Sequence, residues 1–267
     1  MSLGRIQRGP APPPTAAGAS HVGRVRAENQ DAFIDRTDIG LWAVADGVGG
    51  LADGRLASTS LVEALATIGR PASAADLLAQ FEERVWQANR ALRHYASEKA
   101  VSLGTTVVAL LVHGDVYACL WAGDSRLYLI RAGAISRLSD DHTEAAALLK
   151  RGIVTAEEAQ SWPRRNIITR AVGVADEIEL DMVEGMVEPG DVFVLCSDGL
   201  TGHLADNEIL ALAAGRVPRA ACEALIETTL ARGASDNVTV IVVAMPAARR
   251  DPAEMTVLKP RRTSGDG

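Results

Sequence analysis

Four aspartates mark the ends of apolar runs, and this pattern constrains the fold more than any other feature of the chain. They are Asp46 after LWAVA, Asp124 after VYACLWAG, Asp198 after VFVLCS and Asp236 just before VTVIVVA. Such short apolar runs predict buried strands, so the carboxylates are carried on a rigid frame and can converge at one rim. Like charges at the edge of an apolar core repel each other and lose hydration, so this layout favours compensation by a divalent cation.

Each aspartate also has a purely structural interpretation. The two Asp-Gly pairs are strong hairpin-turn signals, although neither is followed by a second strand two residues on. A tight turn explains Asp124, which joins two apolar runs, and an Asx turn explains Asp236 with Asn237. The four aspartates together are less easily explained by turns than any one alone.

Composition limits the class of protein. The 267 residues are 48% apolar and 23% charged, which is typical of one main globular domain. A net charge of -7 argues against a general nucleic-acid binder, and no apolar run reaches the roughly 18 residues of a membrane span. Three cysteines form no C-x-x-C pair, which indicates reduced thiols. We expect a cytoplasmic monomer without membrane insertion.

The chain divides into a central folded part and two tails. Residues 1–19, rich in Pro, Ala and Gly, predict a disordered tail, and residues 247–267 predict a flexible basic tail that a partner or the acidic body could bind. Clustered strands with helices grouped apart from them favour an α+β architecture for residues 20–246. We expect strands near residues 31–45, 104–112, 115–122, 126–131, 192–197 and 238–244, and helices over 55–68, 73–98, 143–151, 155–161, 206–214 and 218–232.

The types of ligand suggest which ion would bind. Carboxylate oxygens without nearby His or Cys favour Mg²⁺ or Mn²⁺ over zinc or copper. Two such ions about 4 Å apart would activate water for displacement at phosphorus. A phosphate also needs a cationic anchor, and Arg26 lies five residues before Asp31. Taken alone, Arg26 is better explained as a solvated surface arginine.

The motifs resemble those of the metal-dependent protein serine/threonine phosphatases of type 2C, in their compact bacterial form. The segments that carry the resemblance are GRVRAENQD, VADGVGG, SLGTT, WAGDSRLY, SDDHT, RRNIITRAVG, CSDGLTGHL and SDNVTVIVV, in that order. The resemblance implies two packed antiparallel β-sheets flanked by helices. It also implies hydrolysis of phosphoserine and phosphothreonine in proteins by a metal-bridging hydroxide, in opposition to a bacterial serine/threonine kinase.

The resemblance assigns roles to individual residues. Asp46 would bridge two Mn²⁺ or Mg²⁺ ions, the Gly47 carbonyl would join one of them, and Asp198 with Asp236 would complete the other. Asp31 would orient the metal-bound water.

Further roles follow in the same way. Arg26 would bind the phosphate, and Asp124 with Asp198 would hold a possible third ion. Asn237 would fix the loop that presents Asp236.

Two positions depart from the family pattern. Val48 stands where animal members have a histidine proposed as proton donor, and Gln30 stands where a carboxylate is often found. Gln30 can still bond a metal-bound water but adds no charge. His142 is a candidate replacement donor, because an imidazole titrates near neutrality, although a histidine in a loop is more often structural.

The segment about 143–170 resembles the mobile flap beside the family's active site. Arg170, Arg164 and Arg165 could contact acidic groups of a phosphopeptide, and a solvated face explains the last two as well. Trp162 is better explained as a packing anchor than as a peptide contact.

Two other functions stay open from the sequence. A non-catalytic phosphoprotein-binding module on the same fold is one, although clustered negative charge gains little against a dianion. A phosphoesterase for small molecules is the other.

Overall fold

The computed structural model describes residues 13–49 and 53–247, and the chain there forms two antiparallel sheets. The first sheet has the order β1 (Thr15–His21), β11 (Val238–Ala244), β10 (Val192–Cys196), β7 (Arg126–Arg131) and β8 (Ala134–Arg137). The second has the order β2 (Asp31–Arg36), β3 (Leu41–Gly49), β5 (Val107–His113), β6 (Val116–Ala122) and β9 (Asp181–Met186), and β4 (Leu103–Thr105) pairs with the end of β3.

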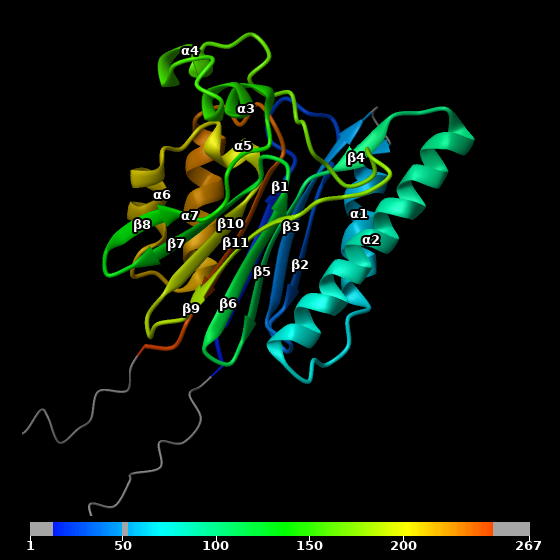
Figure 1. Ribbon diagram of the computed structural model, residues 1–267. Helices are drawn as coiled ribbons and strands as arrows, with labels where there is room; N and C mark the ends of the chain where they lie inside the picture. Colours follow the sequence, from blue (N-terminus) through cyan, green and yellow to red (C-terminus); the bar gives the residue numbers. More distant parts are fainter. Residues whose placement is uncertain (1–12, 50–52, 248–267) are drawn as a thin grey trace, which may run out of the picture.

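Helices cover both outer faces of the sheet pair (Figure 1). The described helices are α1 (Asp53–Ala66), α2 (Ala74–Lys99), α3 (Glu144–Lys150), α4 (Ala156–Gln160), α5 (Asp198–Thr201), α6 (Asp206–Ala213) and α7 (Pro218–Ala231). The helices α1 and α2 pack on the second sheet, and α6 and α7 pack on the first. No described helix has both the length and the apolar character that crossing a bilayer requires.

Side-chain alternation explains how one strand serves two cores. In β11, Ile241 and Val243 point into the layer between the sheets, whereas Val240 and Val242 point toward α7. Both faces are buried, so the strand is a continuous apolar run. The layer between the sheets also contains Trp42 from β3 in the second sheet, which has no exposed surface.

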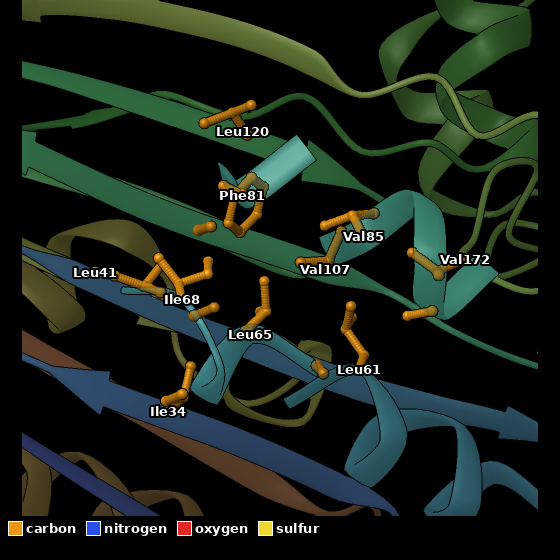
Figure 2. Packing of buried hydrophobic residues seen from close by; sticks show 14 of the residues in the cluster. Ile34, Leu41, Leu61, Leu65, Ile68, Phe81, Val85, Val107, Leu120 and Val172 are labelled. Atoms are coloured by element: carbon orange, nitrogen blue, oxygen red, sulfur yellow. The ribbon is translucent and has the colours of Figure 1, made fainter. Parts of the chain in front are cut away.

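The core beneath α1 and α2 is mainly aliphatic, with Phe81 among its buried side chains (Figure 2). Leu61 and Leu65 of α1 lie one helical turn apart, as do Phe81 and Val85 of α2, and all four are fully buried. Each such side chain stabilises the fold by about 2 kcal/mol through apolar burial. This packing anchors β3, whose end carries Asp46.

The predicted α+β sandwich is confirmed, and so are several local signals. Ser73 caps α2, because its side chain accepts a hydrogen bond from the Asp76 amide at 3.1 Å. The turns at Gly114-Asp115 and at 131–133 join β5 to β6 and β7 to β8 as antiparallel hairpins.

The N-terminal prediction needs a correction. Residues 15–19, assigned to a disordered tail, belong to β1, which pairs with β11 from Thr15 opposite Ala244 to His21 opposite Val238. The alanines and Gly18 give a weak strand signal, and the long-range partner supplies the hydrogen bonds that local propensity does not. Residues 1–12 and 248–267 of the predicted tails lie outside the described residues, so the proposed domain boundaries remain predictions.

Besides β1, three elements were absent from the sequence-based prediction. The edge strands β8 and β9 carry mainly exposed or half-exposed residues, so they lack the apolar runs that marked the other strands. The short helix α5 begins at Asp198 itself. The Asp46-Gly47 pair is not a hairpin turn, because β3 continues to Gly49.

Candidate metal centre

The acidic residues at the strand ends come together at one end of the sandwich. Asp46 lies near the end of β3 in the second sheet, and Asp31, at the start of β2, is its partner across the strand pair. Asp198 follows β10 and Asp236 precedes β11, both in the first sheet. Burial, and then the negative charges of Asp31, Asp198, Asp124 and Asp236, raise the pKa of Asp46 well above its ordinary value.

Asp46 and Asp198 are directly hydrogen bonded through their side chains. Two carboxylates at such close range avoid repulsion either by sharing a proton or by binding a cation. Burial, followed by the charge of Asp236, also raises the pKa of Asp198. A proton between two buried carboxylates occupies a place that a cation can take.

Two buried carboxylate oxygens lack a hydrogen-bond partner, namely Oδ1 of Asp31 and Oδ1 of Asp124. The other Asp31 oxygen accepts a 2.7 Å bond from the Ser197 hydroxyl. Burial is the main cause that raises the pKa of Asp31 to about 6 and that of Asp124 to about 7. Unpartnered buried polar atoms are costly, and these two belong to the same coupled acidic cluster.

Arg26 is the cation at the edge of this cluster. Its Nη2 donates to Oδ2 of Asp236 at 2.7 Å, and its side chain remains 56% exposed. That bond raises the pKa of Arg26, and the charges of Asp198 and Asp46 add to the effect. The guanidinium therefore faces both the carboxylates and the solvent.

Asn237 ties the Arg26 loop to the start of β11. Its side-chain amide donates to the carbonyls of Val22 and Glu28 at 2.9 and 3.0 Å, and its Oδ1 accepts from the Gln30 amide at 2.8 Å. Asn237 was predicted to fix the loop that presents Asp236, and its side-chain bonds join that loop to residues 22–30. The backbone carbonyl oxygen of Asn237 also packs closely against Gly199. A Cβ at residue 199 would lie 1.9 Å from that oxygen, so only glycine fits there.

Gly47 shows a similar close approach. Its amide donates to the Gln30 carbonyl at 3.1 Å, and an added Cβ would lie 2.0 Å from the Gly54 carbonyl. Gly47 is therefore needed for backbone packing, whatever its carbonyl binds. Val48, beside it in β3, pairs with Gly104 of β4. The last glycine of the VADGVGG motif, Gly50, lies outside the described residues.

Hydroxyl side chains also support the cluster, and the sequence-based prediction did not identify them. Thr106 accepts a bond from the Asp46 amide at 2.9 Å and bonds to Ser125 at 2.8 Å. Ser197 donates to Asp31 and accepts from the Thr239 amide. All of these hydroxyls lie within the quoted motifs, but their small polar side chains give no signal of their own.

The residues fit a hard cation, although they do not form a finished cage. Among residues 13–49 and 53–247, no group of three or more His, Cys, Asp or Glu side chains is arranged to hold one ion as it stands. The acids instead lie close enough for their charges to act on one another, and two of them carry an unpartnered buried oxygen. An oxygen-only donor set of this kind matches Mg²⁺ or Mn²⁺, with backbone carbonyls and water completing the shell.

The ring nitrogens of His142 are engaged by Gly123 and Asp181. Its Nδ1 accepts from the Gly123 amide at 3.2 Å, and its Nε2 lies 3.2 Å from Oδ2 of Asp181. Its side chain is 11% exposed, and burial is the main cause that lowers its pKa. Arg170 is ion-paired with Asp181 and with Glu179, and its Nη1 lies 3.4 Å from Nε2 of His142.

The 143–170 segment projects at the same end of the sandwich as α5 (Figure 1). It contains α3 and α4, as predicted, and Thr155 starts α4 with a capping box. Trp162 is half-buried and donates to Glu144 at 2.9 Å, which agrees with a packing anchor. Arg164 pairs with the same glutamate at 2.9 Å.

Comparison with known proteins supports a single family. The family model for protein phosphatase 2C matches residues 17–237. The serine/threonine protein phosphatase PstP of Mycobacterium tuberculosis is 37% identical over 230 residues, which are 85% of this chain but 44% of PstP. The protein phosphatase PhpP of Streptococcus pneumoniae is 34% identical, over 84% of this chain and 94% of PhpP. The chain thus spans less than half the length of PstP.

Solved structures agree with the sequence relatives. PppA, described as a regulatory component of the type VI secretion system in Pseudomonas aeruginosa, superposes with a TM-score of 0.82 at 39% identity, covering 88% of this chain and 99% of PppA. The catalytic domain of PstP with two manganese ions superposes with a TM-score of 0.78 at 33% identity, covering 86% of this chain and 97% of that domain. The fold, the acidic rim and the family match agree, and the chain belongs to the protein phosphatase 2C family.

Proposed function

We propose that this chain is a metal-dependent phosphoprotein phosphatase that hydrolyses phosphoserine and phosphothreonine. The observation that carries the proposal is the buried acidic cluster, in which Oδ1 of Asp31 and Oδ1 of Asp124 lack a partner, beside the exposed Arg26 that pairs with Asp236. A cluster of buried acids is unfavourable for binding a phosphate dianion unless cations offset it. The two manganese ions in the PstP catalytic domain support the same conclusion for this chain.

Specific residues would hold the ions. Asp46, the carbonyl of Gly47, Asp198 and Asp236 would hold two Mn²⁺ or Mg²⁺ ions, and Asp124 with Asp198 would hold a third. The unpartnered Oδ1 of Asp124 supports the third position. When bound, divalent ions at such a site supply charge stabilisation to phosphoryl oxygens and activate water at neutral pH.

The protein's own residues position the reaction. The Arg26 guanidinium would bind two phosphate oxygens in a fork and hold phosphorus in line with the attacking water. The Asp31 carboxylate, itself held by Ser197, would orient that water. The oxygen of water attacks phosphorus, the bond from phosphorus to the serine or threonine oxygen breaks, and one proton of the attacking water ends on that leaving oxygen. The products are inorganic phosphate and the free hydroxyl side chain.

The partners follow from this reaction. Phosphorylated proteins would be the substrates, and a bacterial serine/threonine kinase would supply them. The names of the curated relatives, which are serine/threonine protein phosphatases, support this assignment.

Hydrolysis of p-nitrophenyl phosphate and of phosphothreonine peptides, with and without chelator, tests the proposal. We expect turnover that requires Mn²⁺ or Mg²⁺ and that survives replacement of Cys119, Cys196 and Cys222, which are all buried and have raised pKa values. Metal-independent turnover would contradict the proposal. Phosphopeptide binding that persists in Asp46→Asn and Asp198→Asn, without turnover in the wild type, would favour a binding module. Faster hydrolysis of phosphorylated metabolites than of phosphopeptides would favour a small-molecule phosphoesterase.

A further inference from the structure

His142 binds both backbone polar groups of Gly123, the residue that precedes Asp124. The amide of Gly123 donates to Nδ1 of His142 at 3.2 Å, and the amide of His142 donates to the Gly123 carbonyl at 2.9 Å. Gly123 has φ +116, and a side chain there would meet Thr106 at 2.6 Å, so the turn has little room to shift. His142 thus fixes the turn that carries the buried Asp124 carboxyl.

The other ring nitrogen of His142 reaches a different element. Because Nδ1 accepts a hydrogen bond, the ring proton is on Nε2, which donates to Oδ2 of Asp181 at 3.2 Å. Asp181 is the first residue of β9, and its other oxygen bonds to Arg170. The imidazole therefore links the Asp124 turn to β9 and to the end of the 143–170 segment.

The backbone around His142 joins both ends of that segment. Its carbonyl accepts from the Thr169 amide at 2.8 Å, and Thr143 pairs with Ile168 in an isolated bridge. The indole of Trp121 stacks on the imidazole with ring centroids 6.1 Å apart. The ring is thus enclosed, and its Nε2 proton is already donated to Asp181.

We propose that His142 is a positioning residue, which couples the Gly123–Asp124 turn to the base of the 143–170 segment through its two ring nitrogens. The inference deepens the proposed function, because it rests on the role of Asp124 in ion binding and on that segment lying beside the substrate. A shift at the base of the 143–170 segment would therefore move the Asp124 carboxyl. A shift of the Asp124 carboxyl would likewise move the base of that segment.

Two substitutions separate the two nitrogens. In His142→Asn the side-chain oxygen stands near the place of Nδ1 and can still accept from the Gly123 amide, but nothing reaches Asp181. In His142→Gln the side-chain nitrogen stands near the place of Nε2 and can still donate to Asp181, but the Gly123 amide loses its acceptor. Asp181→Asn removes the carboxylate charge that faces both Arg170 and Nε2 of His142, leaves the Nδ1 bond to Gly123 in place, and serves as a third variant.

Amide hydrogen exchange of the metal-free protein measures each half of the coupling. In His142→Gln we expect the Gly123 amide to exchange roughly two- to tenfold faster, while the Glu144 and Thr169 amides stay close to wild type. In His142→Asn and Asp181→Asn we expect the Glu144 and Thr169 amides to exchange faster, while the Gly123 amide stays close to wild type. Calorimetric titration with Mn²⁺ should show weaker binding of the weakest ion in His142→Gln than in His142→Asn.

Several results would overturn the proposal. Equal loss of protection at both places in both substitutions at residue 142 would indicate a general packing role. Exchange like wild type in both, together with loss of the basic limb of kcat against pH, would assign His142 to proton donation instead. Hydrogen exchange needs no turnover, so an inactive wild type would contradict the proposed function and leave this test intact.

Discussion

Arg26 and Asp236 form an ion pair across the edge of the acidic cluster, with Nη2 and Oδ2 2.7 Å apart. Asp236 is proposed to bind a metal ion, and Arg26 is proposed to bind the substrate phosphate. In the absence of both ligands, the two side chains neutralise each other's charge. A cation that takes the Asp236 carboxylate would free the guanidinium for phosphate. Ion loading and substrate binding should therefore be linked through this pair.

The first prediction concerns the competition between Arg26 and the metal. Arg26→Gln removes a cation that is bonded to Asp236, so we expect Mn²⁺ to bind roughly two- to tenfold more tightly in calorimetric titration. We also expect kcat/KM to fall about 100-fold, because the phosphate loses a charged, forked contact.

Arg55→Gln is the matched control. Arg55 is similarly exposed, at 61%, and pairs with Glu28 rather than with Asp236. If Arg55→Gln tightened Mn²⁺ binding as much as Arg26→Gln, the effect would be one of total charge and not of the ion pair.

The second prediction concerns the charge repulsion within the cluster. In Asp198→Asn the new amide can donate to Asp46, and one buried charge disappears, so the metal-free protein should be more stable by about 1 kcal/mol in urea unfolding. The same change should abolish measurable turnover and weaken Mn²⁺ binding. Asp115→Asn, in the exposed β5–β6 turn, should change none of these quantities. A less stable metal-free Asp198→Asn protein would contradict the repulsion argument.

The third prediction is a pH dependence. The folded pKa values of Asp31 and Asp124, about 6 and about 7, lie above the ordinary value of 3.8, so between pH 4 and 7 the folded state binds more protons than the unfolded state. The metal-free protein should therefore lose stability as pH rises through this window, by at most about 1.4 kcal/mol per pH unit for each group.

Thermal unfolding in chelator at pH 5 and at pH 7.5 measures this effect. We expect a lower Tm at the higher pH, and a smaller difference in Asp124→Asn. Saturating Mn²⁺ should reverse the trend, because ion binding displaces protons from the same carboxyls. A metal-free Tm that rises with pH would show that other groups dominate.

The fourth prediction concerns β1, whose residues the sequence pattern assigned to a tail. In Gly18→Ala the added methyl would lie 2.3 Å from the ring of Phe33, so the ring must move from its place beside the inter-sheet core. We expect a loss of about 1–3 kcal/mol in the free energy of unfolding. Gly69→Ala is the control, since its nearest neighbour would lie 3.8 Å away.

The acidic residues of the site could be predicted because strand ends leave a local signal. An aspartate beside an apolar run is visible in the sequence, and Asp46, Asp124, Asp198 and Asp236 do lie at or beside strand ends. Asp31 follows no apolar run and was assigned through the family resemblance. The sequence does not show which side chain binds each carboxylate oxygen. The Arg26 bond to Asp236 joins residues 210 positions apart, and the bond from Ser197 to Asp31 spans 166.

The missed elements have the same cause. The strand β1 depends on its pairing with β11, which no local pattern reveals. The exposed edge strand β9 supplies Asp181, and without β9 the surroundings of His142 could not be predicted. Interactions that are distant in sequence therefore decided both the correction to the fold and the position of the histidine.

The proposed ligands come from both sheets, Asp46 from β3 and the pair Asp198 and Asp236 from the ends of β10 and β11. Among the described residues no strand belongs to both sheets, so the distance between these two groups depends on the apolar layer around Trp42 and on rim contacts such as the bond from Ser197 to Asp31. Slight sliding of one sheet against the other would spoil the geometry while leaving every strand intact. On gradual heating, catalysis should accordingly fail several degrees before circular dichroism records any loss of secondary structure.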